Sequence, residues 1–133
     1  MLAIADTGFI VSIWCKTPSR RQWARDWLGK AALPLLTSTA NLQEAGWLLR
    51  NHAYAIQMVL DGDLKVVLDT QEEANVLHGL ISKYAGRMDL ADASIVRLSE
   101  LYPRAKVLTV DKTDFNIYRR FGREHIPCDF PPE

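Results

Sequence analysis

The chain contains 133 residues with a mass of 15.1 kDa, which corresponds to about one domain. Hydrophobic residues make up 48% of the sequence and charged residues 24%, a composition typical of folded globular proteins and not of disordered chains. Because 16 acidic residues balance 16 lysines and arginines, the formal net charge of zero excludes a polycation that coats nucleic acid or an anionic membrane.

Short apolar runs alternate with helical patterns along the first half of the chain. On the helix expected near residues 20–30, Trp23, Trp27 and Leu28 share one face. The long helical region that follows is expected to break near Asn51 and His52. The expected elements are a strand over 2–5, a helix over 7–14, a helix near 20–30, a weak strand over 34–37 and a helical region over about 39–60.

The second half continues this alternation after a turn at residues 61–63. Its strands are continuous apolar runs, which are typical of a parallel sheet that is covered on both faces. The alternation predicts an α/β fold, and the absence of a linker or repeat predicts one domain over residues 1–133. The expected elements are a strand over 64–68, a helix over 70–84, a helix over 90–101, a strand over 105–110, a short helix over 113–120 and a proline-rich tail.

The cysteines and the N-terminal residues indicate a cytoplasmic protein. Cys15 and Cys128 form no metal-binding spacing, and we expect them to be free thiols in a reduced cytosol. The N-terminal apolar run lacks basic residues and is interrupted by Asp6, so it does not resemble a signal peptide. No apolar stretch approaches the roughly 18 residues that a membrane span needs, so we expect no association with a membrane.

Acidic residues follow three of the expected strands. They are Asp6, Asp69 and Asp111, and ligands of open parallel sheets bind beyond the carboxyl ends of the strands. Each of the three also has an interpretation as a helix N-cap. For Asp69 the capping interpretation is favoured, because Glu72 stands three residues later.

Two further acids have unusual positions on their helices. Asp92 lies inside the apolar arc of its helix, where an ionised carboxylate loses hydration, whereas Asp89 is placed to cap that helix. Glu44 lies at the edge of an apolar stripe and has no basic residue one turn away. For Glu44 a solvated surface position and a functional position remain equally open.

If Asp6, Glu44, Asp92 and Asp111 converge above the sheet, they need a cation. Four carboxylates at close range cannot all stay ionised without one. Oxygen ligands alone favour Mg²⁺ or Mn²⁺ over zinc, and such a site can activate water and neutralise a phosphodiester. The sequence lacks the common phosphate-loop, zinc-protease and serine-hydrolase motifs. A carboxylate–metal hydrolase is the class that remains.

Segments along nearly the whole chain, in order, resemble the PIN-domain ribonucleases and in particular the VapC-type toxins of bacterial toxin–antitoxin pairs. The last two of these segments are fairly specific for the family. The matching segments are DTGFIV from Asp6, LLTS from Leu35, LQEA from Leu42 with Leu48 and Leu49, MDLADAS from Met88 and VLTVDKTDF from Val107.

The resemblance implies a three-layer α/β/α fold with a mainly parallel sheet and a metal-dependent endoribonuclease site. Asp6 and Asp92 would be the direct ligands of Mg²⁺ or Mn²⁺, and Glu44 and Asp111 would bind a second ion or orient the attacking water. Asp114 would be an auxiliary ligand. Supporting hydroxyl groups would come from Thr7 and Thr109.

The resemblance also implies partners. RNA would be the substrate, a cognate antitoxin would hold the activity in check, and whether two copies pair is left open. Basic residues cluster in the second helix and near the C-terminus, and they are candidates for phosphate contacts. The candidates are Arg20, Arg21, Arg119 and Arg120.

Two alternatives remain open from the sequence. A receiver-like signalling module also places acids at strand ends around Mg²⁺, and in it Asp69 and Lys112 would be the phosphoacceptor and the lysine. That alternative leaves Glu44 and Asp92 unexplained. The second alternative is a PIN fold without catalytic activity that binds RNA or another protein.

Overall fold

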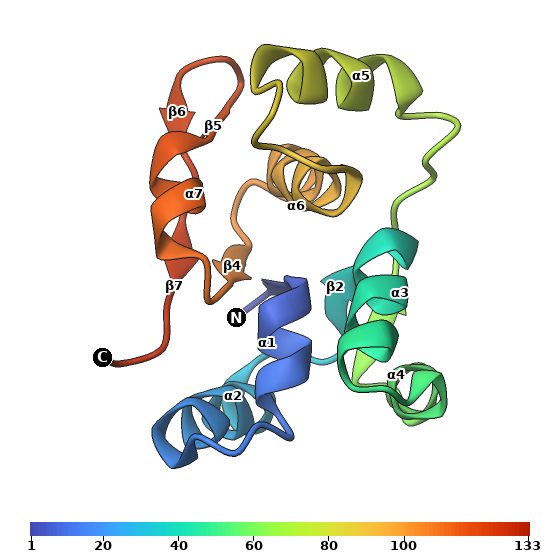
Figure 1. The fold of residues 1–133 in the computed structure, drawn as a ribbon, viewed down its shortest axis with the longest axis vertical. Helices are drawn as coiled ribbons and strands as arrows, with labels where there is room; N and C mark the ends of the chain where they lie inside the picture. Colours follow the sequence, from blue (N-terminus) through green and yellow to red (C-terminus); the bar gives the residue numbers. More distant parts are fainter.

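A parallel sheet of five short strands lies at the centre of the structure, a computed structural model that describes all residues from 1 to 133 (Figure 1). The strand order is β3-β2-β1-β4-β7, and every neighbouring pair is parallel. The strands are β1 (Ala3–Ala5), β2 (Leu35–Thr37), β3 (Leu64–Val66), β4 (Lys106–Leu108) and β7 (Cys128–Asp129).

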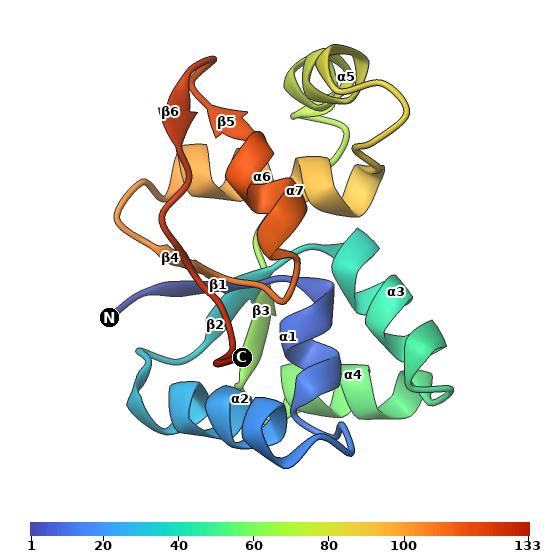
Figure 2. The same ribbon diagram turned by 60° about the vertical axis from the view of Figure 1, so that its left-hand side comes forward.

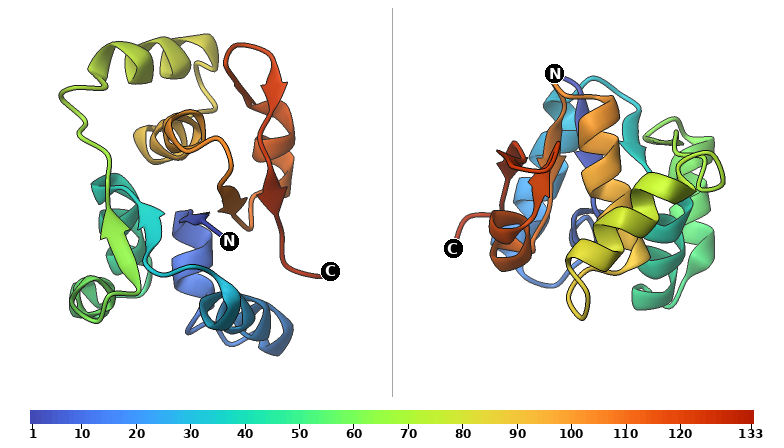
Figure 3. Two further views of the ribbon diagram at one scale, coloured as in Figure 1. Left: turned by 180° about the vertical axis from the view of Figure 1, so that it is seen from behind. Right: turned by 90° about the horizontal axis from the view of Figure 1, so that it is seen from above.

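Helices cover both faces of the sheet and complete a three-layer α/β/α fold, which confirms the predicted fold class (Figure 2). One face is covered by α1 (Thr7–Ser12), α2 (Pro18–Lys30), α3 (Thr39–Leu48) and α4 (His52–Leu60). The other face is covered by α5 (Ala74–Lys83), α6 (Leu90–Leu101) and α7 (Lys112–Ile117). A small antiparallel hairpin of β5 (Arg119–Arg120) and β6 (Glu124–His125) follows α7. Figure 3 shows the molecule from behind, with α4 beside β3.

The buried central strand β1 leads directly to Asp6, the first of the candidate ligands. Its three residues are fully buried, because β2 and β4 flank it and helices cover both faces. The ladder continues one step past the strand, where the Asp6 backbone N–H donates to the carbonyl of Leu108 at 3.0 Å. Asp6 therefore leaves the sheet at the middle of its carboxyl edge, where α1 begins.

The structure confirms most predicted elements and moves some of their boundaries. The expected break in the 39–60 region is present: α3 ends at Leu48 and α4 begins at His52, with the Asn51 side chain as its N-cap. The helix expected over 70–84 begins only at Ala74.

One expectation about local structure was wrong, and one segment contains a strand that the sequence did not reveal. Asp69 does not cap α5; its Oδ1 atom accepts from the backbone N–H groups of Gln71 and Glu72, at 3.0 and 3.2 Å, and closes the turn before the helix. The proline-rich tail is not only a closing segment, because Cys128 and Asp129 add a fifth strand beside β4. A two-residue strand flanked by prolines carries no period that the sequence could reveal.

Cys15 and Cys128 are unpaired, and burial raises the pKa of the Cys128 thiol to about 12. None of the helices combines the length and the apolar character that crossing a membrane requires.

Candidate active site

Four acidic side chains come from four segments near the carboxyl edge of the sheet, where α1, α3 and α7 begin after β1, β2 and β4 (Figure 2). The negative charges of Glu44 and Asp111 contribute to a raised pKa of Asp6, and that of Asp6 contributes to a raised pKa of Asp92. Asp6 is thus the group that connects the other three. Asp6 follows β1, Glu44 lies within α3, Asp92 lies in the first turn of α6 and Asp111 precedes α7.

Asp6 is 6% exposed, and both of its carboxylate oxygens are hydrogen-bonded. Its Oδ1 atom accepts from the backbone N–H of Thr7 at 2.8 Å, which caps α1, and from Nδ2 of Asn41 at 3.2 Å. Its Oδ2 atom accepts from the Thr109 hydroxyl at 2.6 Å. These donors come from α1, α3 and the segment after β4, so one carboxylate joins three elements.

Burial raises the pKa of Asp6 from its ordinary value of 3.8 to about 6. The hydrogen bonds from Thr109 and Thr7 favour the charged form and lower the pKa. The nearby charges of Glu44 and Asp111 raise it again. A buried carboxylate that is surrounded by like charges is a place where a cation would be stabilised.

Asp92 has an even stronger tendency to keep its proton, since burial and the neighbouring charge of Asp89 raise its pKa to about 7. Its Oδ2 atom accepts from the Tyr118 hydroxyl at 2.9 Å, and its backbone N–H donates to Asp89 at 2.8 Å. Asp89 is therefore the N-cap of α6, as predicted. Burial and the charge of Asp92 raise the pKa of Tyr118, so the tyrosine remains a donor.

Asp111 and Asp114 form a second, more exposed part of the acidic group. The Oδ1 atom of Asp111 accepts from the backbone N–H of Asp114 at 3.0 Å and caps α7. Burial raises the pKa of Asp111, the charge of Asp114 raises it too, and Arg87 lowers it. Arg87 forms an ion pair with Asp114, with 2.5 Å between Nη1 and Oδ1. The predicted auxiliary acid is therefore neutralised by a residue of the loop before α6.

The hydroxyl groups of Thr7 and Thr109 both form hydrogen bonds beside Asp6. The buried Thr109 hydroxyl donates to Asp6 and accepts from the backbone N–H of Asp111 at 3.1 Å, so it spans two of the acids. Thr7 accepts from Nδ2 of Asn41 at 3.0 Å. Both hydroxyls orient the groups around Asp6.

Asn41 is the residue of the site that the sequence analysis did not assign. It is fully buried, and its amide nitrogen donates to Asp6 and to Thr7. Its Oδ1 atom accepts from the hydroxyl of Ser38, the N-cap of α3. The sequence contained one signal for Asn41 as a site residue: Asn41 lies one helical turn before Glu44, so both residues are on one face of α3.

The donor set fits a hard divalent cation in its chemistry, because every candidate ligand is an oxygen atom of a carboxylate. In the positions that the side chains occupy, no three carboxylate, histidine or cysteine groups are arranged to hold one metal ion. Binding of a cation therefore requires rotation of some of these side chains toward a common point.

The four arginines predicted to contact RNA differ in their availability. Arg120 is 6% exposed; its guanidinium donates to the carbonyls of Ser99 and Pro103 and to Glu124, so it holds the fold together and is not free for phosphate. Arg119 donates to the last carbonyls of α7. Arg21 donates to the Cys15 carbonyl at 2.8 Å. Arg20, on α2, is exposed and forms no side-chain hydrogen bond or ion pair.

Asp69 and Lys112 do not join the acidic group. Asp69 follows β3, an edge strand, and its carboxylate is used in the turn described above. Lys112 is exposed and lies 3.7 Å from the carboxylate of Glu133. The contacts of Asp69 and Lys112 therefore give no support to the receiver-like alternative.

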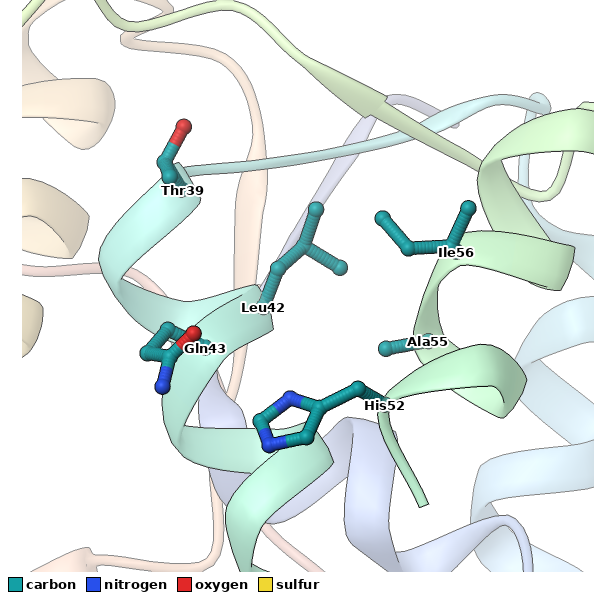
Figure 4. Close-up of a pocket in the computed structure, with 6 residues that line it drawn as sticks. All are labelled: Thr39, Leu42, Gln43, His52, Ala55 and Ile56. Carbon is teal, nitrogen blue, oxygen red and sulfur yellow. The ribbon is translucent and has the colours of Figure 1, made fainter.

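A separate pocket of about 350 Å³ lies between α3 and α4 (Figure 4). Gly46 permits the close packing of the two helices there, because a methyl group at this position would overlap the His52 side chain. The pocket contains no acidic residue, so it is distinct from the acidic group. Its lining residues are Thr39, Leu42, Gln43, His52, Ala55 and Ile56.

No model of a known protein family matches the chain, and no curated protein matches its sequence. The functional assignment therefore rests on the residues and contacts of this chain.

Proposed function

We propose that this protein is a metal-dependent endoribonuclease of the PIN-domain type, which hydrolyses RNA phosphodiester bonds at the acidic group. The observation that carries the proposal is Asp6: a buried carboxylate at the centre of a parallel sheet edge, with Glu44, Asp92 and Asp111 close enough to influence it or be influenced by it. Such a concentration of negative charge opposes RNA binding unless a cation compensates it.

Mg²⁺ or Mn²⁺ would be held by Asp6 and Asp92, with Glu44 and Asp111 beside them. Such an ion, when bound, neutralises charge on the phosphodiester and lowers the pKa of a bound water. The protein's own contribution is orientation: Thr109 and Asn41 fix Asp6, and Tyr118 fixes Asp92. With pKa values raised to about 6 and about 7, Asp6 is mostly ionised at neutral pH, whereas a large share of Asp92 still carries its proton. Cation binding near neutral pH would therefore displace a proton mainly from Asp92.

The biological setting that the proposal favours is a cytoplasmic toxin with a cognate antitoxin. The resemblance of the motifs around Asp6, Asp92 and Asp111 to VapC-type toxins supports this setting, and the free thiols are compatible with it. Expression of the wild-type chain in bacteria should arrest growth, whereas the Asp6→Asn variant should not. Co-expression of a small protein encoded just upstream should relieve the arrest.

The direct test is cleavage of structured RNAs by purified protein. We expect cleavage by the wild type in Mg²⁺ or Mn²⁺ and none in EDTA. Asp6→Asn and Asp92→Asn should each lower the rate by about 100-fold or more, because each removes a ligand charge and leaves the fold intact.

Asp69→Asn is the matched control for this test, because Asp69 also follows a strand but lies outside the acidic group. The control should cleave RNA like the wild type. Cleavage that survives EDTA, or equal rates for the wild type, Asp6→Asn and Asp92→Asn, would falsify the proposed function.

A further inference from the structure

Two buried tryptophans of α2 bind the same carboxylate oxygen of the C-terminal strand. The indole N–H groups of Trp23 and Trp27 donate to Oδ2 of Asp129 at 2.8 and 2.6 Å. The side chains of the two tryptophans are 8% and 6% exposed. Figure 2 shows the C-terminal segment passing from β7 toward α2. These contacts give the tryptophan pair of the second helix a definite partner about 100 residues away in the sequence.

Asp129 is connected to Asp6 through one residue of the neighbouring strand segment. The backbone carbonyl of Asp129 accepts from the backbone N–H of Thr109 at 3.2 Å, and the Thr109 hydroxyl donates to Oδ2 of Asp6 at 2.6 Å. On its other side, the same segment accepts from Asp6, whose N–H donates to the carbonyl of Leu108. The end of β4 is therefore held between Asp6 and Asp129.

Trp23 also contacts the element on the other side of Asp6. Its ring packs edge-to-face against Phe9 of α1, with 5.4 Å between ring centroids and 78° between ring planes. Asp6 is the N-cap of α1, so Trp23 contacts the helix that begins at Asp6. Through Asp129, Trp23 also contacts the strand that pairs with the Thr109 segment.

The strand that carries Asp129 has few ladder hydrogen bonds, although Cys128 and Phe130 on it and beside it pack against the core. β7 contains two residues, lies at the edge of the sheet and pairs only with β4. Short edge strands contribute few ladder hydrogen bonds. Side-chain hydrogen bonds to a charged carboxylate are therefore well placed to set the position of β7, and with it the position of Thr109.

We propose that Asp129, held by Trp23 and Trp27, is a positioning residue that orients Asp6 through Thr109 for cation binding. This inference rests on the proposed function. It assigns a role in the site to the tryptophan pair of α2, which packs with α1 on one face of the sheet.

The test compares Asp129→Ala and Trp27→Phe with the wild type and with Asp26→Ala as the control. Trp27→Phe removes one N–H donor and keeps an aromatic ring, so it remains informative if the alanine variant does not fold. Asp26 lies between the two tryptophans on α2, is exposed, and accepts only from Gln22. Mn²⁺ binding is followed by electron paramagnetic resonance of the free ion, and RNA cleavage by kcat and KM.

We expect Asp129→Ala to weaken Mn²⁺ binding and lower kcat by about tenfold each, with KM for RNA nearly unchanged, as is usual when a partner of a ligand is removed. Trp27→Phe should act in the same direction and more weakly, and Asp26→Ala should match the wild type. Tryptophan fluorescence should change in Asp129→Ala and not in the control.

A lower melting temperature with unchanged Mn²⁺ affinity and unchanged kcat in the folded variants would show a purely structural contact and overturn the inference. If the wild type binds Mn²⁺ and cleaves RNA, that result leaves the proposed function intact. If the wild type neither binds Mn²⁺ nor cleaves RNA, the proposed function fails, and this inference fails with it.

Discussion

Asp6 caps α1 with one oxygen and accepts the Thr109 hydroxyl with the other, so its capping and functional interpretations are compatible. The same holds for Asp111, which caps α7 and lies in the acidic group. Position after a strand made both residues candidates but did not distinguish them from Asp69, which lies outside the acidic group. Their surroundings were not predictable, because Asn41 and Tyr118 reach the acids from segments more than 20 residues away.

Replacing Asp6 should stabilise the ion-free protein at high pH. Its pKa is about 6 in the folded chain and near 3.8 in the unfolded chain, so the folded state loses stability as pH rises between these values. The shift corresponds to about 3 kcal/mol. Asp6→Asn has no carboxyl group that titrates at this position. The free energy of unfolding of Asp6→Asn minus that of the wild type should therefore be larger at about pH 8 than at about pH 4, by up to about 3 kcal/mol.

Urea denaturation of the wild type and Asp6→Asn at both pH values checks this prediction. The control is Asp69→Asn, whose relative stability should not follow the same course. A relative stability of Asp6→Asn that is independent of pH would contradict the raised pKa of Asp6.

Asn41 should matter for both stability and cation binding. Asn41→Ala removes a donor to Asp6 and the acceptor of the buried Ser38 hydroxyl, so we expect a loss of about 1–3 kcal/mol in unfolding free energy. Mn²⁺ affinity should fall by about tenfold, since the orientation of a ligand is lost. Gln43→Ala, an exposed position on the same helix, is the control for both measurements and should leave them unchanged.

At the scale of the elements, the sequence predicted those with a long or continuous apolar pattern. β1, β2 and α6 were located within one or two residues, because all residues of the two strands are buried and α6 has a continuous buried face. The start of α5 was misplaced, since Asp69 and Glu72 form a capping pattern that a turn uses instead. β7 was missed because it has two residues and is defined by its pairing with β4, which a local pattern does not contain.

The close approach of α1 to the segment after β4 depends on Gly8. A methyl group on Gly8 would overlap the Val110 side chain, which stands between Thr109 and Asp111. Gly8→Ala should therefore displace the segment after β4, with a loss of about 1–3 kcal/mol in stability and reduced RNA cleavage.

The matched control for this change is Gly79→Ala in α5. No atom lies within 4 Å of a methyl group built there, so alanine should stabilise the helix by about 0.5–1 kcal/mol and leave cleavage unchanged. Thermal unfolding and the cleavage rate measure both outcomes. Equal behaviour of the two variants would show that the approach of Gly8 to Val110 has no part in the site.

Over the whole molecule the net charge is zero, but acidic and basic side chains are unevenly distributed. Acidic groups gather at the carboxyl edge of the sheet, whereas Arg120 is buried in the fold and Arg119 and Arg21 bind backbone carbonyls. The predicted basic surfaces are therefore smaller than the sequence indicated. The three-layer fold was predictable from the order of elements. The hydrogen-bond partners of each arginine were not predictable, because they depend on contacts between segments that are separated in the sequence.

The central claim is that the four acids form one cation site, and a Mn²⁺ titration tests it most directly. We expect saturable binding to the wild type and to the Asp69→Asn control. Binding should be tighter at about pH 8 than at about pH 6, because Asp6 and Asp92 must first lose protons. Asp92→Asn should weaken binding by at least about tenfold. Absence of saturable binding to the wild type, or equal affinity of Asp92→Asn and the wild type, would contradict the claim.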